Sequence, residues 1–271
     1  MIEYIENADP RAGIIEPYET QWFGTDTEVR HRSNVHNQVD MKANGWQEAE
    51  PFVYYYNPEK PIKTDTVDLV YRINKHGFRG DPLPLFETPR SIITLGDATT
   101  FGVGMPEGIT WTSHVSNSLK YRGINLGMPG ASIDTCFRVL LAWLPRLKSK
   151  YVFMLEPMTP STENIFSQPS FEGLPANQIS TDWLMHKEKT MRAMQNVCDQ
   201  FNSRLVILQH TQWAEDENQI IFNSQGERDK ARDLHSPGRK CHIYITYRML
   251  KMINFEWDIE IAMKGSEHEL D

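Results

Sequence analysis

Three polar side chains follow directly after an apolar strand, and they are the residues best placed for chemistry. The strand Ser91–Leu95 runs into Gly96, and Asp97, Thr99 and Thr100 come next. In an open parallel sheet, ligands and catalytic side chains gather at the carboxyl ends of the strands. A carboxylate beside two hydroxyls is compatible with nucleophilic catalysis when a general base is nearby. Neighbouring positions at a strand end point in different directions, so the two threonines are not interchangeable.

The same turn carries a motif with one altered position. Residues 96–102 read Gly-Asp-Ala-Thr-Thr-Phe-Gly, which resembles block I of the SGNH (GDSL-type) hydrolases, Gly-Asp-Ser-x-Thr-x-Gly. The resemblance implies an acyl-transfer site whose nucleophile is the serine, and Ala98 stands at that position. A methyl group cannot attack a carbonyl. Thr99 or Thr100 would act as nucleophile only if that role had moved along the chain.

Two later segments are similar to the blocks that form the family's oxyanion hole. The sequence Asn-Leu-Gly-Met-Pro-Gly around Gly127 resembles block II, Asn-x-Gly-x-x-Gly, and implies that the N–H groups of Gly127 and Ala98 face the developing oxyanion. The alternative is a glycine that merely lets the chain turn. Where block III has an asparagine, this chain has Glu156. An ionised carboxylate donates no hydrogen bond, so we expect an incomplete oxyanion hole unless Asn164 reaches in.

A last segment resembles the block that supplies the general base. Residues 231–238 read Ala-Arg-Asp-Leu-His-Ser-Pro-Gly, similar to block V, Ala-Arg-Asp-x-x-His-Pro-Gly. The resemblance implies that Asp233 orients an imidazole. However, His235 lies one position early and Ser236 occupies the place of the base, so the imidazole turns elsewhere unless the loop rearranges. Ser236 before Pro237 is also typical of a helix N-cap followed by proline at the first helical position.

An upstream segment extends the resemblance. Residues 71–80 read Tyr-Arg-Ile-Asn-Lys-His-Gly-Phe-Arg-Gly, similar to a segment in a subgroup of SGNH-like proteins from bacterial and phage genomes. A short Pro-rich link joins it to the block I strand. The resemblance as a whole covers residues 70–253 and is consistent with a virion-associated or accessory structural role.

Hydrophobic patterning supplies the elements that would position these residues. Strands and helices alternate along the second half of the chain, which predicts an α/β fold: a three-layer α/β/α doubly wound parallel sheet of the flavodoxin-like SGNH type. In the helix expected over 180–201, we expect Trp183, Leu184, Met194 and Cys198 to point inward. The expected strands are 52–56, 68–73, 91–95, 123–128, 150–155 and 205–208, and the other expected helices are 110–121, 131–148 and 237–253.

The chain divides into four parts by composition. The first part is rich in aromatic and polar residues without sustained periodicity, and its Trp and Tyr side chains are costly to leave in water. We expect this arm to pack on its own domain, or to bind a second copy or a protein partner. The parts are an N-terminal arm over 1–60, a short β segment and linker over 61–90, an SGNH-like α/β domain over 91–255 and an acidic C-terminal tail over 256–271.

Charge and composition exclude several classes of function. The net charge of −8 leaves no basic footprint for nucleic acid or an anionic membrane surface. The acidic N-terminus and the lack of a long apolar run argue against a signal peptide and a membrane span, so a cytoplasmic or virion-associated location is expected. Cys136, Cys198 and Cys241 are widely separated, as expected of buried thiols. Scattered histidines and the lack of a phosphate loop predict neither a metal nor another cofactor.

Two hypotheses of function follow. The first is an SGNH-like domain that has lost catalysis and is kept to bind a carbohydrate or acyl-ester ligand, or as an assembly component. The second is an active esterase or carbohydrate deacetylase that uses Asp97, a threonine hydroxyl, Asp233 and His235. An engineered Ser-to-Ala change would explain Ala98 but neither Glu156 nor the position of His235, so we favour natural divergence.

Overall fold

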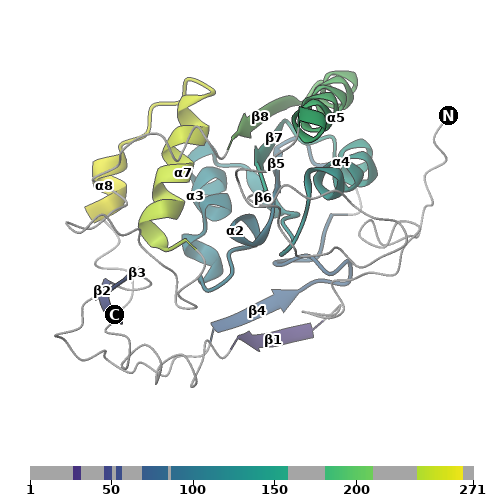
Figure 1. Ribbon diagram of the computed structural model, residues 1–271. Coiled ribbons are helices and arrows are strands. Elements are labelled where there is room, and N and C mark those ends of the chain that lie inside the picture. Colours follow the sequence, from purple (N-terminus) through teal and green to yellow (C-terminus); the bar gives the residue numbers. More distant parts are fainter. Residues whose placement is uncertain are drawn as a thin grey trace.

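A four-stranded parallel sheet forms the centre of the molecule. The computed structural model describes residues 27–31, 46–50, 53–56, 69–84, 87–157, 181–209 and 237–264. The sheet has the strand order β6-β5-β7-β8, and every neighbouring pair is parallel. Its strands are β5 (Ser91–Leu95), β6 (Arg122–Asn125), β7 (Tyr151–Leu155) and β8 (Arg204–Leu208). Helices cover both faces (Figure 1), which confirms the predicted three-layer α/β architecture.

The two faces of the sheet bury separate sets of side chains because residues along a strand alternate in direction. Ile93 and Met154 pack against α4 (Ile133–Leu147) and α5 (Thr181–Gln200). Ile92 and Phe153, their neighbours in sequence, pack against α3 (Trp111–Leu119) and α7 (Arg239–Lys251) on the other face. The central strand β5 is therefore buried along its whole length.

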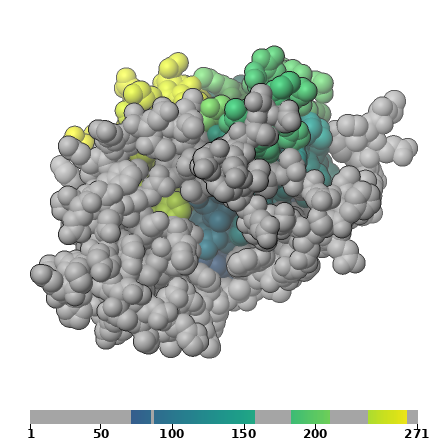
Figure 2. All heavy atoms as spheres, in the orientation of Figure 1, coloured from purple at the N-terminus to yellow at the C-terminus, as the bar shows by residue number. Residues whose placement is uncertain are grey.

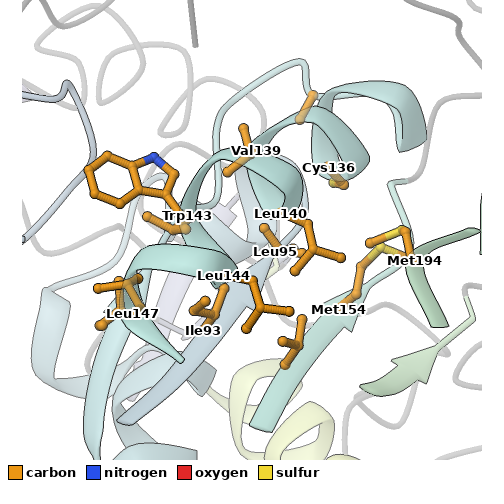
Figure 3. Packing of buried hydrophobic residues seen from close by; sticks show 14 of the residues in the cluster. Ile93, Leu95, Cys136, Val139, Leu140, Trp143, Leu144, Leu147, Met154 and Met194 are labelled. Atoms are coloured by element: carbon orange, nitrogen blue, oxygen red, sulfur yellow. The ribbon is translucent and has the colours of Figure 1, made fainter. Parts of the chain in front are cut away.

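The core between the sheet and α4 contains closely packed aliphatic side chains and sulfur atoms. Figure 3 shows Leu140 and Leu144 of α4 between Ile93 and Met154, with Met194 of α5 beside Met154. Met154 and Met194 are fully buried in this core. Cys136, Cys198 and Cys241 are buried and form no disulfide, which confirms the prediction of buried thiols. Burial, with Asp199 nearby, raises the pKa of the Cys198 thiol to about 12, so it is an unreactive neutral group.

Helix α5 corrects one expectation about its inward face. Leu184 is about half exposed, at 49%, whereas Met194 and Cys198 are fully buried as predicted. Successive helical residues differ in direction by about 100°, and the buried stripe leads from Trp183 through position 187 to Met194 and Cys198. Leu184 therefore lies beside this stripe and not on it.

Hydrophobic periodicity did not predict two polar strands and a short C-terminal helix. In the predicted arm, β1 (Thr27–His31) pairs antiparallel with β4 (Leu69–Ile73) of the same chain, and β2 (Trp46–Glu50) pairs with β3 (Val53–Tyr56). In the predicted C-terminal tail, α8 (Ile259–Lys264) begins where Asp258 accepts hydrogen bonds from two backbone N–H groups. None of the helices in the described ranges is both long and apolar enough to span a membrane.

Helices α3 and α7 enclose two histidines. Trp111 donates its backbone N–H to Nδ1 of His242 at 3.1 Å. Burial, then His114 and Arg79, lower the pKa of His242 to about 3. Burial and Arg239 lower the pKa of His114 to about 4. Both imidazoles are therefore neutral at pH 7. In the space-filling view, the yellow-green C-terminal residues lie directly beside blue and teal residues from earlier in the chain (Figure 2).

Candidate functional site at the carboxyl edge of the sheet

The block I motif folds as a strand, a tight turn and a short helix. Gly96 has φ +149°, and an added Cβ there would lie 2.1 Å from Thr100 Oγ1 and 2.8 Å from Leu155 O, so no other residue fits. Asp97 is the N-cap of α2 (Ala98–Phe101), and its side chain accepts the N–H of Thr99 at 3.0 Å. Ala98 begins the helix and is half-buried, which leaves a methyl group at the strand end.

The two threonines beside Ala98 are not displayed at this edge. Thr99 is 3% exposed and Thr100 is completely buried. The hydroxyl of Thr100 donates to Leu95 O, within its own turn, at 3.3 Å. A nucleophile has to reach a substrate carbonyl, and in this conformation neither hydroxyl does so.

Gly127 is a position where two backbones approach closely. An added Cβ would lie 2.7 Å from both Phe101 N and Thr100 Cβ. The N–H of Gly127 donates to Oδ1 of Asn125 at 2.9 Å, and Nδ2 of Asn125 donates to Thr100 O at 2.9 Å. Asn125 therefore ties the block II turn to α2. To stabilise an oxyanion, the Gly127 N–H would first have to leave Asn125.

We expect the Gly127→Ala variant to be less stable by about 3 kcal/mol, because its methyl group meets backbone that cannot move aside. The measurement is the free energy of unfolding in urea. Gly108→Ala is the matched control, since an added Cβ there meets nothing within 4 Å. Equal stability of the two variants would contradict the close packing of the block II turn on α2.

The block III position holds an ion pair. Glu156 follows β7 and accepts a hydrogen bond from Lys187 of α5 at 2.7 Å. Both side chains are largely buried, with 11% and 19% exposed, respectively. An ionised Glu156 donates no hydrogen bond, and Lys187 balances its charge. Sequence reasoning missed Lys187, although a lysine on the inward stripe of α5 was a signal that it has a buried partner.

A second pair joins α5 to the start of α4. His186 Nε2 lies 2.8 Å from Oδ1 of Asp134, which is in the first turn of α4. Ser132 caps this helix by accepting the N–H of Thr135 at 3.2 Å. Two consecutive residues of α5 thus reach two carboxylates at the carboxyl edge of the sheet. No local feature of the sequence indicated the His186 pair.

The segment that precedes β5 holds α2 from its other end. Asn74 Oδ1 accepts the N–H groups of His76 and Phe78, which shapes the turn. Phe78 is buried in the core beside α4. Arg79 is buried, and its guanidinium donates to three main-chain carbonyls at the end of α2 and just after it. The upstream motif therefore positions the block I helix.

Four of the predicted site residues lie outside the described residues: Asn164, Asp233, His235 and Ser236. Their roles in catalysis and in the oxyanion hole stay predictions. The expected N-cap at Ser236 is wrong, because α7 begins at Arg239 with Gly238 as its N-cap. Pro237 precedes the helix, so its fixed φ is not used in the first turn.

The described part of the site is polar and contains charge pairs. It brings together Asp97, the Ala98 methyl group, the Gly127 turn and the Glu156–Lys187 pair at neighbouring strand ends. Over the described ranges, no group of three or more His, Cys, Asp or Glu side chains is arranged to hold a metal ion. The polar groups named here are already paired within the chain.

Comparison with known proteins finds similarity only at the level of structure. No family model matches the chain, and no curated protein matches it. A member of the lipolytic protein G-D-S-L family from Veillonella parvula matches with 13% identity and a TM-score of 0.34, covering 60% of this chain and 98% of that one. A psychrotrophic esterase from a Pseudoalteromonas species matches with 13% identity and a TM-score of 0.36, covering 61% and 98%.

A catalytic mutant of an acetylxylan esterase from Geobacillus stearothermophilus also matches, with 13% identity, a TM-score of 0.35 and coverage of 64% of this chain and 98% of that one. The Veillonella parvula protein is a member of the lipolytic G-D-S-L family that block I resembles. At such identities and TM-scores these likenesses carry no argument about this chain. The function of this chain has to be argued from its own residues.

Proposed function

We propose that this chain is an SGNH-type domain that binds a ligand at the carboxyl edge of its sheet without hydrolysing it. The ligand class is a carbohydrate or an acyl ester, as the resemblance to the SGNH hydrolases implies. Through its N-terminal arm, the domain would serve in an assembly with copies of itself or with a partner, including a virion. The alternative is an active esterase or deacetylase.

One observation carries the proposal: the strand end of β5 presents a methyl group while both neighbouring hydroxyls are buried. Loss of the nucleophile in a Ser-His-Asp enzyme costs about a million-fold in turnover. The oxyanion site adds to this loss, because the Gly127 N–H is held by Asn125 and Glu156 replaces an amide donor. Loss of one such donor costs a further hundred- to thousand-fold, roughly.

The test is an ester hydrolysis assay with an activated acetate ester and with acetylated sugars. We expect the unaltered chain to show no turnover above buffer. We expect Ala98→Ser to stay nearly silent, because restoring the hydroxyl restores neither the oxyanion donors nor a base at position 236. Adding Ser236→His to Ala98→Ser should raise turnover above that of Ala98→Ser alone.

Two outcomes would contradict the proposal. Turnover by the unaltered chain that His235→Ala abolishes would establish an active hydrolase with an atypical site. Strong activity of Ala98→Ser alone would mean that the missing hydroxyl is the one defect, which would favour an engineered or recent change. Urea unfolding of each variant controls for loss of the fold.

A further inference from the structure

A cavity lies beside the edge strand β6, and the Ala98 strand end is not part of its wall. It has a volume of about 130 Å³ and is bounded by the connection from β4 to β5, the 3₁₀ helix η2 (Glu107–Ile109), the first two turns of α3 and the outer side of β6. Ala98, Gly127 and Glu156 do not line it. The cavity borders the candidate site through Asn125, which lines it and also holds the Gly127 N–H.

The hydroxyl groups in the wall of this cavity are already committed as donors. Thr110 Oγ1 donates to Glu107 O at 2.9 Å, and Ser113 Oγ donates to the same carbonyl at 2.6 Å. Ser116 Oγ donates to Ser113 O at 2.9 Å. A hydroxyl has one hydrogen and two lone pairs. Thr110 Oγ1 already accepts the Ser113 N–H as the N-cap of α3, so the hydroxyl oxygens of Ser113 and Ser116 are the ones that offer acceptor sites to the cavity.

The charged groups in the wall are balanced in sign. The carboxylate of Glu107 lies against Gly80, since a Cβ added at Gly80 would be 3.1 Å from Glu107 Oε1. Asp81 is the second carboxylate in the wall, and Arg79 and Arg122 are the two cations. The guanidinium of Arg122 is exposed and uses Nη2 to bind Pro82 O at 2.9 Å, which leaves its other N–H groups as donors.

From this wall we propose that the cavity binds the vicinal-diol edge of a small neutral polyol or sugar. Each ligand hydroxyl donates to an acceptor, at Glu107, Ser113 or Ser116, and its oxygen accepts from Arg122. The two cations disfavour an ammonium ligand, and the wall of acceptors disfavours an anion. The volume equals about four water molecules, which matches glycerol or one edge of a pyranose ring.

The experiment is a ligand-observed NMR titration of the full chain with 1,2-propanediol, glycerol and D-xylose. 1,3-Propanediol, ethylammonium and inorganic phosphate are the comparison ligands. We expect saturable binding of the three vicinal diols and at least about tenfold weaker binding of the comparison ligands, since one good hydrogen bond is worth about that factor.

Variants locate the site. Glu107→Gln changes an exposed side chain, so the fold is kept, and it should weaken diol binding about tenfold. Ser116→Ala, which removes only the hydroxyl, should weaken it by a similar factor. Asn117→Ala is the matched control, because Asn117 is the next residue of α3, is exposed and does not line the cavity. It should leave binding unchanged.

Three results would overturn the inference. The first is the absence of saturable diol binding up to the highest diol concentration at which the chain stays folded. The second is diol binding that Glu107→Gln leaves unchanged, which would put the ligand elsewhere. The third is tighter binding of phosphate or ethylammonium than of glycerol, which would assign the cavity to a charged ligand.

Discussion

Between pH 7.5 and pH 5, the free energy of unfolding is expected to fall by about 4 kcal/mol because two buried histidines take up no proton in the folded chain. The pKa of His242 is lowered to about 3, first by burial and then by His114 and Arg79. The pKa of His114 is lowered to about 4, first by burial and then by Arg239. Protonating either imidazole would place a charge between α3 and α7.

The direction follows from proton binding in the two states. An unperturbed histidine has a pKa of about 6.5, so below that pH the unfolded chain binds protons that the folded chain does not. Each histidine then contributes about 1.4 kcal/mol per pH unit, which is about 2 kcal/mol at pH 5. The stabilising effect is complete above about pH 6.5 and is lost as the pH falls toward the two folded pKa values.

Urea unfolding at a series of pH values measures this effect. His242→Asn keeps an acceptor for the Trp111 N–H, and His114→Phe keeps a ring beside Trp257. Each should remove about half of the pH dependence, and the double variant should remove nearly all of it above pH 5. Thr246→Val at the same helix contact is the control, since it changes stability but keeps both histidines. A double variant with the full slope would refute the assignment.

The Arg79→Met variant is expected to unfold with a free energy lower by about 4 kcal/mol. Arg79 Nη1 donates to Phe101 O at 3.1 Å and to Gly102 O at 2.6 Å, and Nη2 donates to Met105 O at 2.8 Å. Methionine fills much of the same volume but donates nothing. The three carbonyls would each lose this donor in a buried place.

Two opposing contributions set the size of the effect. The guanidinium lies 4.5 Å from the Tyr71 ring centroid and 5.5 Å from that of Phe101, so cation–π attraction adds to the loss. Burial lowers the pKa of Arg79 to about 10, which shows that the charge is costly to desolvate, and this cost disappears in the variant. We therefore expect less than the sum of three charged hydrogen bonds, at about 1.5–3 kcal/mol each.

Urea unfolding measures this variant, and hydrogen exchange of the α2 amides shows where the loss occurs. Arg79→Lys should lose about 2 kcal/mol, because a compact ammonium cannot replace the planar fork at three carbonyls. Arg72→Met on β4 is the control, since Arg72 is exposed and its loss should cost less than about 0.5 kcal/mol. A similar small loss for Arg79→Met would mean that the guanidinium does not hold α2.

Local patterning predicted the elements of the α/β unit well. The apolar run of β5 and the helical spacing of Ile133, Leu140 and Leu144 in α4 are each recorded in a few neighbouring residues, and both are found in the core. The strand β1 was missed, because its one apolar residue, Val29, provides no alternation. Its pairing with β4 joins residues about forty positions apart.

The motifs located the strand ends that converge, and their chemistry depends on partners that no motif contains. The sequence predicted that Ala98, Gly127 and Glu156 each follow a strand of the sheet, and it has an alanine where the motif has a serine. It did not indicate that Lys187 neutralises Glu156, or that Asn125 occupies the Gly127 N–H. Those contacts join separate elements, so their geometry depends on how the elements pack.

Residue types and their spacing were thus sufficient to predict the main strands and helices of the α/β unit, and with them the edge of the sheet where the motif residues lie. Hydrophobic periodicity is a property of short segments, which is why it can be recognised along the chain. Whether a polar group at that edge is available for binding depends on its hydrogen-bond partners. Those partners come from distant segments, and packing of the helices on the sheet selects them.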